Sequence, residues 1–125
     1  MLYHTCICVR DVERSARFYD PVMAVLGYRR FHDLTPHAIA YGLDRGEFWL
    51  QTPENQHSPD ISRGCHYAFT AKDRATVDAF HAAATAAGGI TDLKPGHYPQ
   101  YHPDYYGAVI SDLDTNKVEV LVYPR

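Results

Sequence analysis

The stretch His4-Thr-Cys-Ile-Cys-Val-Arg-Asp11 returns later in the chain, with altered residues, as His66-Tyr-Ala-Phe-Thr-Ala-Lys-Asp73. In both copies the aspartate follows the histidine by seven residues, and a phenylalanine follows it by fourteen, at Phe18 and Phe80. A glycine ends the helical pattern after 23 residues in the first copy and after 22 in the second. Two equal spacings, and a third that differs by one residue, indicate a duplicated supersecondary unit, and this duplication decides the fold.

Each copy begins as a strand and continues as a helix. Asp11 and Asp73 stand where a helix N-cap is expected, because a carboxylate there accepts hydrogen bonds from the free N–H groups of the first turn. Pro21 falls inside the first helical pattern, and it predicts an interruption of that helix near residues 19–20.

Short strands are expected after each helix, at about residues 28–33, 38–43, 47–52, 90–93, 105–111 and 117–123. Residues 112–116 should form a tight turn between the last two strands. The order is therefore βαβββ twice, an α+β fold in which two paired modules form a curved mixed sheet with a cleft. We expect one domain over residues 1–125, with module one at about 1–53, a linker at about 54–63 and module two at about 64–125.

Composition is that of an ordinary globular domain, with 125 residues, 46% of them apolar and 22% charged. The net charge is −3 and basic tracts are absent, which argues against a nucleic-acid or membrane-surface partner. Neither a signal peptide nor a membrane-spanning stretch is recognisable, so we expect a cytoplasmic protein. The odd number of cysteines, three, favours reduced thiols.

Three side chains are candidate ligands for a divalent metal. His4 and His66 occupy equivalent positions on the first strands of the two copies, so both should face the cavity. Glu119 interrupts the apolar strand Val118–Val122, where an unpaired charge would be costly to bury. Two imidazoles and a carboxylate with open positions suit Fe(II), Mn(II), Zn(II) or Ni(II). Gln51 occupies roughly the first-copy position of Glu119, as a weaker ligand or substrate contact.

Simpler readings of these residues stay open. A single histidine on a strand is more often structural than a ligand, and Glu119 on its own could be an exposed edge residue. Cys6 and Cys8 share the face of His4 and could be soft ligands, although such cysteines are more often small buried hydrophobes.

A tyrosine- and histidine-rich run spans residues 97–106. It suits either a surface loop or a lid over a ligand. Within it, Tyr101, His102 and Tyr105 are candidates to contact substrate or to shuttle a proton, and they are the candidate catalytic residues. Trp49 and Tyr106 are candidates to line the substrate pocket.

Taken together, these motifs resemble the vicinal oxygen chelate superfamily, also called the glyoxalase/bleomycin resistance protein/dioxygenase group. In the first half the resemblance rests on His4, the run Val9-Arg-Asp-Val-Glu-Arg-Ser15, Phe18-Tyr19 and Leu26-Gly27. In the second half it rests on His66-Tyr-Ala-Phe69, Tyr105-Tyr-Gly-Ala108 and Asp112-Leu-Asp-Thr-Asn-Lys-Val-Glu119.

The resemblance implies metal ligands on the first and last strands of each module, which here are His4, Gln51, His66 and Glu119. It implies a homodimer with sites inside one chain or shared between chains. It also implies a small oxygenated substrate that binds the metal through two oxygens, with lyase, isomerase or ring-cleaving dioxygenase chemistry.

Gln51 departs from the glyoxalase I pattern, which generally has an acidic residue at this point. An amide cannot act as the general base that isomerisation of a hemithioacetal needs. The remaining set of two histidines and one glutamate resembles that of extradiol ring-cleaving members. The alternative function is metal-free binding of a small molecule, as in members that sequester drugs.

Overall fold

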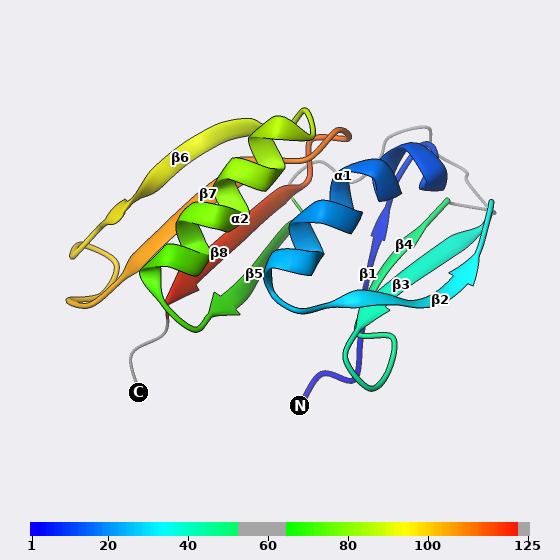
Figure 1. The fold of residues 1–125 in the computed structure, drawn as a ribbon, viewed down its shortest axis with the longest axis horizontal. Coiled ribbons are helices and arrows are strands. Elements are labelled where there is room, and N and C mark those ends of the chain that lie inside the picture. Colours follow the sequence, from blue (N-terminus) through cyan, green and yellow to red (C-terminus); the bar gives the residue numbers. More distant parts are fainter. Residues whose placement is uncertain (53–64, 123–125) are drawn as a thin grey trace.

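The computed structural model describes residues 1–52 and 65–122, and the linker expected at 54–63 therefore lies outside the described residues. Figure 1 shows two helices packed in front of two groups of strands. The elements, in chain order, are β1 (Thr5–Cys8), α1 (Val12–Val25), β2 (Arg29–Leu34), β3 (Ala38–Gly42), β4 (Phe48–Gln51), β5 (His66–Ala71), α2 (Arg74–Ala86), β6 (Ile90–His97), β7 (Tyr106–Ser111) and β8 (Lys117–Val122).

The strands form two four-stranded sheets with the same topology, β1-β4-β3-β2 and β5-β8-β7-β6. In each sheet the first and last strands of the module run parallel, and the other neighbours are antiparallel. The expected α+β fold of two βαβββ modules is confirmed. The parallel pair in each module places the strand that carries a candidate histidine beside the strand that carries Gln51 or Glu119.

Both helices begin at the predicted caps. The Asp11 side chain accepts from the Arg14 backbone N–H, and the Asp73 side chain accepts from that of Thr76. The interruption predicted from Pro21 was wrong, because α1 is continuous from Val12 to Val25 with the proline inside it. Proline removes one hydrogen bond of the helix, and burial of the neighbouring apolar face offsets that loss.

Strand β6 extends further than the 90–93 expected from sequence and takes in the start of the aromatic run. Pro95 lies inside β6, which the sheet tolerates because β6 is its edge strand, where a missing N–H need not leave a neighbour unpaired. The pairing of β6 with β7 is irregular between Leu93 and Gly96, on either side of this proline. The turn predicted at 112–116 is confirmed by the Asp112 N–H, which donates to the Asn116 carbonyl at 2.9 Å.

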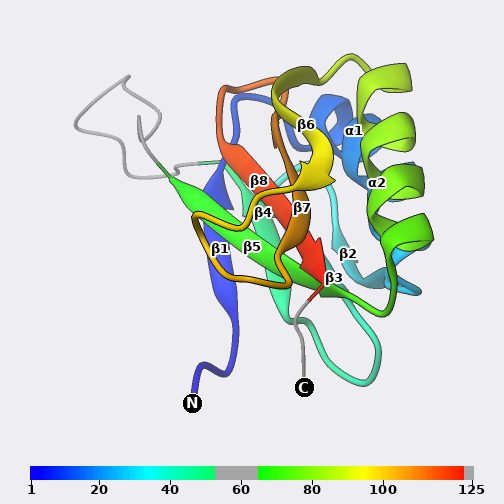
Figure 2. The same ribbon diagram turned by 90° about the vertical axis from the view of Figure 1, so that its left-hand side faces the viewer.

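The two modules share one hydrophobic core. Phe48 of β4 and Phe69 of β5, both on the helix-covered sides of their sheets, have ring centroids 5.3 Å apart. Helices α1 and α2 also pack against each other, whereas β1 and β5 make no close backbone contact along the described residues. Figure 2 shows the helices on one side of the molecule and β1, β5 and β8 on the other. The modules therefore meet through their covered faces.

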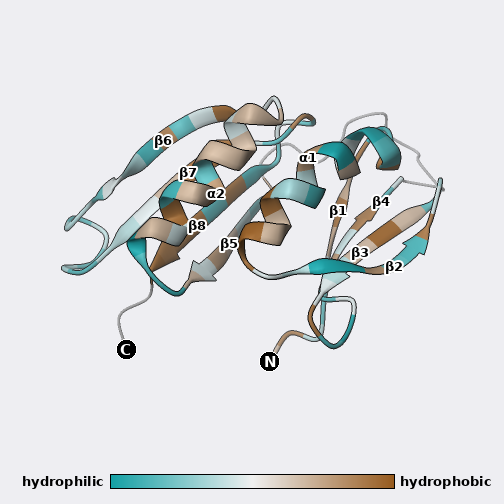
Figure 3. Cartoon of the chain, viewed as in Figure 1, coloured by the Kyte–Doolittle hydropathy of each residue, from teal (hydrophilic) through white to brown (hydrophobic). Residues whose placement is uncertain are grey.

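Apolar residues concentrate in the inner strands. Figure 3 shows more apolar colour along β3, β4, β7 and β8 than along the edge strands β2 and β6. Neither helix in the described part of the chain has the length and apolar character needed to cross a membrane.

A buried polar contact joins α1 of module one to the β7–β8 turn of module two. The Tyr19 hydroxyl donates to Asp112 Oδ2 at 2.5 Å, and the Ser15 hydroxyl donates to Asp114 Oδ2 at 3.1 Å. Asp112 also accepts the backbone N–H groups of Asp114 and Asn116, which holds the turn closed. Burial, followed by the charge of Asp112, raises the pKa of Tyr19 well above its usual value, so the phenol remains a donor.

We expect Tyr19→Phe to lower the free energy of unfolding by about 1.5–3 kcal/mol, because it removes a buried hydrogen bond to a carboxylate. Urea unfolding at neutral pH measures this loss. Tyr28→Phe is the matched control, since the Tyr28 ring packs on Phe69 and its hydroxyl has no hydrogen-bond partner among the described residues. Equal stability of the two variants would contradict a stabilising role for the Tyr19 contact.

Candidate functional site

His66 and Glu119 lie side by side on the uncovered face of the second sheet. Glu119 of β8 pairs in register with Ala68 of β5, two residues after His66, so the alternation of strand side chains puts both on one face. His66 Nε2 is 2.6 Å from Glu119 Oε2. The His66 side chain is 49% exposed and that of Glu119 is 16% exposed, so the pair is reachable from solvent on the histidine side.

Tyr105 holds the other oxygen of the same carboxylate. Its hydroxyl donates to Glu119 Oε1 at 2.5 Å, and the residue is only 7% exposed. Burial, reinforced by the hydrogen bond and charge of Glu119, raises the pKa of Tyr105 well above its usual value. The phenol therefore stays protonated and donating at neutral pH.

The module-one candidates form a separate group around Trp49. The exposed His4 ring lies edge-on to the Trp49 ring, with centroids 6.2 Å apart. His32 stacks on the same indole at 5.4 Å, an aromatic pair that the sequence interpretation missed. Gln51 ends β4 and pairs in register with Cys8 of β1. Trp49 pairs with Cys6 as Glu119 pairs with Ala68, so the first-copy counterpart of Glu119 is Trp49 and not, as expected from the sequence, Gln51. His4, Trp49 and Gln51 share the uncovered side of the first sheet by strand alternation.

The structure thus brings together two of the three candidate metal ligands. Over residues 1–52 and 65–122, His, Cys, Asp and Glu side chains form no group of three that could hold a metal ion. His4 lies with Trp49, apart from the His66–Glu119 pair, and the three-ligand set remains a prediction. Burial, and then the neighbouring Cys8, raise the pKa of the Cys6 thiol, which disfavours the thiolate form that a metal needs.

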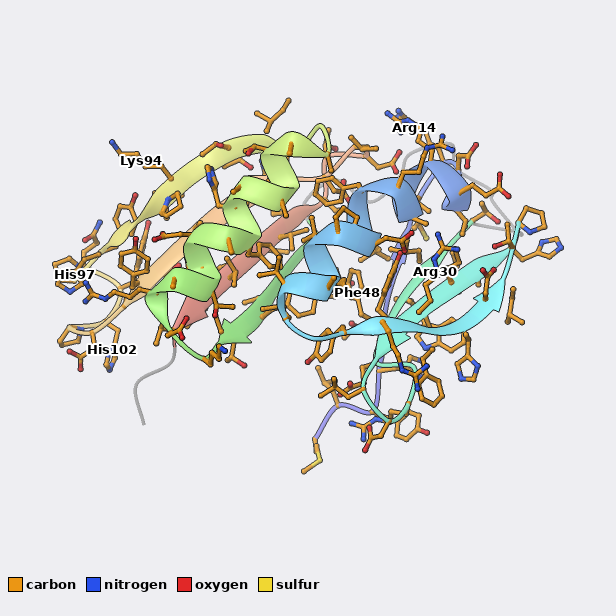
Figure 4. All side chains as sticks on the ribbon, viewed as in Figure 1. Arg14, Arg30, Phe48, Lys94, His97 and His102 are labelled. Carbon is orange, nitrogen blue, oxygen red and sulfur yellow. The ribbon has the colours of Figure 1, made fainter. Side chains whose placement is uncertain are left out.

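The other candidates of the aromatic run lie in different surroundings. Tyr101 is 63% exposed, and its ring is 5.2 Å from that of Tyr105. His102 Nδ1 accepts from the Asp104 backbone N–H at 3.2 Å. Figure 4 shows His97 and His102 at the end of the molecule far from Arg14 and Arg30 of module one. The loop is thus a feature of module two.

Tyr106 points to the opposite side of the second sheet from Glu119. Its hydroxyl donates to Asp78 of α2 at 2.7 Å, and the guanidinium of Arg74 lies 4.8 Å from its ring centroid. Tyr105 lies one residue before Tyr106, where β7 begins. Successive side chains of an extended chain point to opposite faces, so Tyr105 lies on the face of Glu119 and Tyr106 on the face of α2.

A cavity of about 810 Å³ lies elsewhere, where α1 ends and α2 begins, lined by residues 24–27, 70–72 and Thr76. None of the candidate site residues lines it. The polar cluster of His66, Glu119 and Tyr105 is reachable from solvent on the His66 side. It is a better candidate for a functional site than the cavity, because its polar groups converge at hydrogen-bond distance.

The sequence matches the family model of the Glyoxalase/Bleomycin resistance protein/Dioxygenase superfamily over residues 2–120. A glyoxalase/bleomycin resistance protein from Albidiferax ferrireducens T118 is 32% identical, with a TM-score of 0.84 and 99% of each chain covered. This chain is a member of that superfamily, as the motifs of the two modules led us to expect. None of the curated proteins matches it.

Two more distant structures share the fold. A glyoxalase/bleomycin resistance protein/dioxygenase family enzyme from Burkholderia phytofirmans PsJN is 19% identical, with a TM-score of 0.76 and 95% of each chain covered. A lactoylglutathione lyase from Agrobacterium tumefaciens is 21% identical, with a TM-score of 0.69, and 98% of this chain and 92% of that chain are covered. At these identities the likeness concerns the fold alone.

The hydrogen bond of Tyr105 predicts a pH-dependent contribution to stability. We expect Tyr105→Phe to lower the free energy of unfolding by about 1.5–3 kcal/mol near neutral pH. Because the folded-state pKa is raised, this contribution should be fully present below the ordinary tyrosine value of 10.0 and lost as the pH rises through the raised pKa. Urea unfolding between pH 7 and 11 measures the difference from the unsubstituted protein; Tyr101→Phe is the exposed control. A difference that does not shrink above pH 10 would count against this assignment.

Proposed function

We propose that the chain is a glyoxalase-like vicinal oxygen chelate protein, which binds a divalent metal through His66, Glu119 and His4 and acts on a small oxygenated substrate. The observation that carries the proposal is the convergence of His66 Nε2 and Glu119 Oε2 at 2.6 Å on an uncovered sheet face. A neutral imidazole and a carboxylate are a common ligand pair for Fe(II), Mn(II), Zn(II) and Ni(II). The bound metal would act as a Lewis acid on substrate oxygens.

The pair fits such a metal in spacing. Metal–ligand bonds of about 2.0–2.2 Å at a tetrahedral angle put two donor atoms about 3.3 Å apart. The present separation of 2.6 Å would have to widen by less than about 1 Å, and the half-exposed His66 ring has room to turn. The hydrogen bond from the Tyr105 hydroxyl to Glu119 Oε1 can remain in place, so the carboxylate need not move far.

The side chains around the pair have roles that follow from their chemistry. Tyr105 orients Glu119, and Tyr101 and His102 are the proposed substrate contacts at the rim. Gln51, an amide, can donate a hydrogen bond or act as a weak ligand, but it cannot accept a proton from carbon. The site is therefore better suited to binding and polarising two substrate oxygens than to proton abstraction by residue 51.

We propose that a second copy supplies the third ligand, in a homodimer. Because the modules of one chain meet through their covered faces, the uncovered face with His4 and Trp49 is separate from the one with His66. Module one of one copy laid against module two of another would bring these two faces together around one metal. This arrangement uses the same three ligands. It explains why His4 lies apart from His66 and Glu119 within a single chain.

Elemental analysis by mass spectrometry tests the metal. After reconstitution with each of Fe(II), Mn(II), Ni(II) and Zn(II), we expect about one metal per chain for the preferred ion and its loss in His66→Ala. The control is His81→Ala, a histidine on α2 whose ring is bound to the Thr91 hydroxyl at 2.8 Å. Metal retained in His66→Ala would rule out this ligand assignment.

A mixed dimer tests whether the site is shared. One tagged copy carries His4→Ala and a differently tagged copy carries Glu119→Gln. If each site draws on both copies, the mixed dimer has one intact site and binds one metal, whereas either variant alone binds none. If each site lies inside one chain, every site in the mixed dimer is damaged and none binds.

The second candidate function is metal-free binding of a small molecule. The observation in its favour is the aromatic surface on both uncovered faces, with Trp49 stacked on His32 and Tyr101 exposed beside Tyr105. Trp49 is the single tryptophan, so its fluorescence reports ligand at this face. Quenching by bleomycin with equal affinity before and after chelation would support this candidate, and a large loss of affinity on chelation would oppose it.

A further inference from the structure

Glu119 is held at both of its oxygens. Oε2 faces His66 Nε2 at 2.6 Å, and Oε1 accepts the Tyr105 hydroxyl at 2.5 Å. A carboxylate on a strand can otherwise rotate and present either oxygen, or both, to a ligand. The Tyr105 contact occupies Oε1, so Oε2, beside His66, is the oxygen presented to a metal or a substrate proton.

Gly107 makes this contact possible. A Cβ built at Gly107 would lie 2.7 Å from the Tyr105 hydroxyl oxygen and 2.8 Å from its Cζ, distances that real side chains do not adopt. The Tyr105 ring therefore lies directly against the bare backbone of β7. From that position its hydroxyl crosses to Glu119 on the neighbouring strand β8, which pairs with β7.

The loop before β7 fixes Tyr105 independently of any ligand. The Tyr105 backbone N–H donates to the His102 carbonyl at 2.9 Å, and the Tyr105 carbonyl accepts the Tyr98 N–H at 3.0 Å. The rings of Tyr98 and Tyr101 pack against the Tyr105 ring at centroid distances of 6.2 and 5.2 Å. The hydroxyl is thus aimed at Glu119 before anything binds, which is the condition for preorganisation.

We propose that Tyr105 is a positioning residue that fixes Glu119 in a single orientation, with only Oε2 presented beside His66, and that Gly107 is the platform that allows it. The inference deepens the proposed function, since it assigns Glu119 as a one-oxygen ligand. Its first part, the orientation of the carboxylate, concerns the metal-free protein and can be tested without any metal.

The test uses three variants of the full chain. Tyr105→Phe keeps the ring and removes the hydroxyl. Gly107→Ala keeps the hydroxyl but adds a Cβ that meets both the Tyr105 ring and, at 2.8 Å, the Val120 carbonyl oxygen of β8, so it tests the platform less selectively. Tyr98→Phe is the matched control, because it removes a hydroxyl of the same loop that donates to the Lys94 carbonyl at 2.7 Å and not to Glu119. Thermal unfolding and backbone NMR spectra establish which variants are folded.

The first readout is the ¹H–¹⁵N spectrum of the His66 imidazole in the metal-free protein. We expect the ring nitrogen shifts to change in Tyr105→Phe and Gly107→Ala, because the carboxylate that meets Nε2 is released, and to stay unchanged in Tyr98→Phe. Identical His66 signals in all folded variants would overturn the proposal. If Gly107→Ala does not fold, the comparison of the His66 signals in Tyr105→Phe with those in Tyr98→Phe still tests the proposal.

The second readout is Zn(II) affinity, measured by competition with a chelating dye. Loss of a residue that orients a metal ligand is expected to weaken binding about 10- to 100-fold, and Tyr98→Phe should bind as the unsubstituted protein does. An unsubstituted protein that binds none of Fe(II), Mn(II), Ni(II) and Zn(II), combined with altered His66 signals in Tyr105→Phe, would overturn the metal assignment and leave the positioning role intact. Unchanged Zn(II) affinity in Tyr105→Phe would overturn the one-oxygen ligand role.

Discussion

Glu119 is a carboxylate set between two buried valines, Val118 and Val120, on the last strand of the second sheet. A charge in that position is costly unless hydrogen bonds or a cation compensate it. The structure meets this constraint with Tyr105 on one oxygen and His66 on the other. The parallel pairing of β5 with β8, the aromatic loop and the glycine on β7 all bear on that carboxylate. The residues of the candidate site therefore also stabilise the fold, because their hydrogen bonds compensate the charge of Glu119 on the otherwise apolar strand β8.

Much of the fold could be predicted because a duplication repeats local signals at fixed spacing. The caps at Asp11 and Asp73 and the tight turn at 112–116 depend on nearby residues only, and all three were found as predicted. Errors arose where tertiary context overrides local propensity. Pro21 stays inside α1 because the buried face of that helix holds it, and β6 continues through Pro95 because an edge strand has one free side.

The site could be predicted only in part, for a different physical reason. Equivalent positions in two copies say where His4 and His66 lie within each module, but not how far apart the modules hold them. That distance depends on which faces pack together, and here the covered faces do, through Phe48 and Phe69. The side of the sheet taken by Tyr106 likewise depends on where β7 begins, because a shift of one residue exchanges the two faces.

The strand register places Trp49 of the first copy at the position that Glu119 holds in the second. The first copy therefore has an indole stacked on His32 where the second has a carboxylate beside His66. An indole nitrogen is only a hydrogen-bond donor, so it cannot bind a cation as a carboxylate does. The duplication thus kept a histidine at the start of both copies and gave the acid to the second copy, which is why the imidazole and the carboxylate meet on the second sheet.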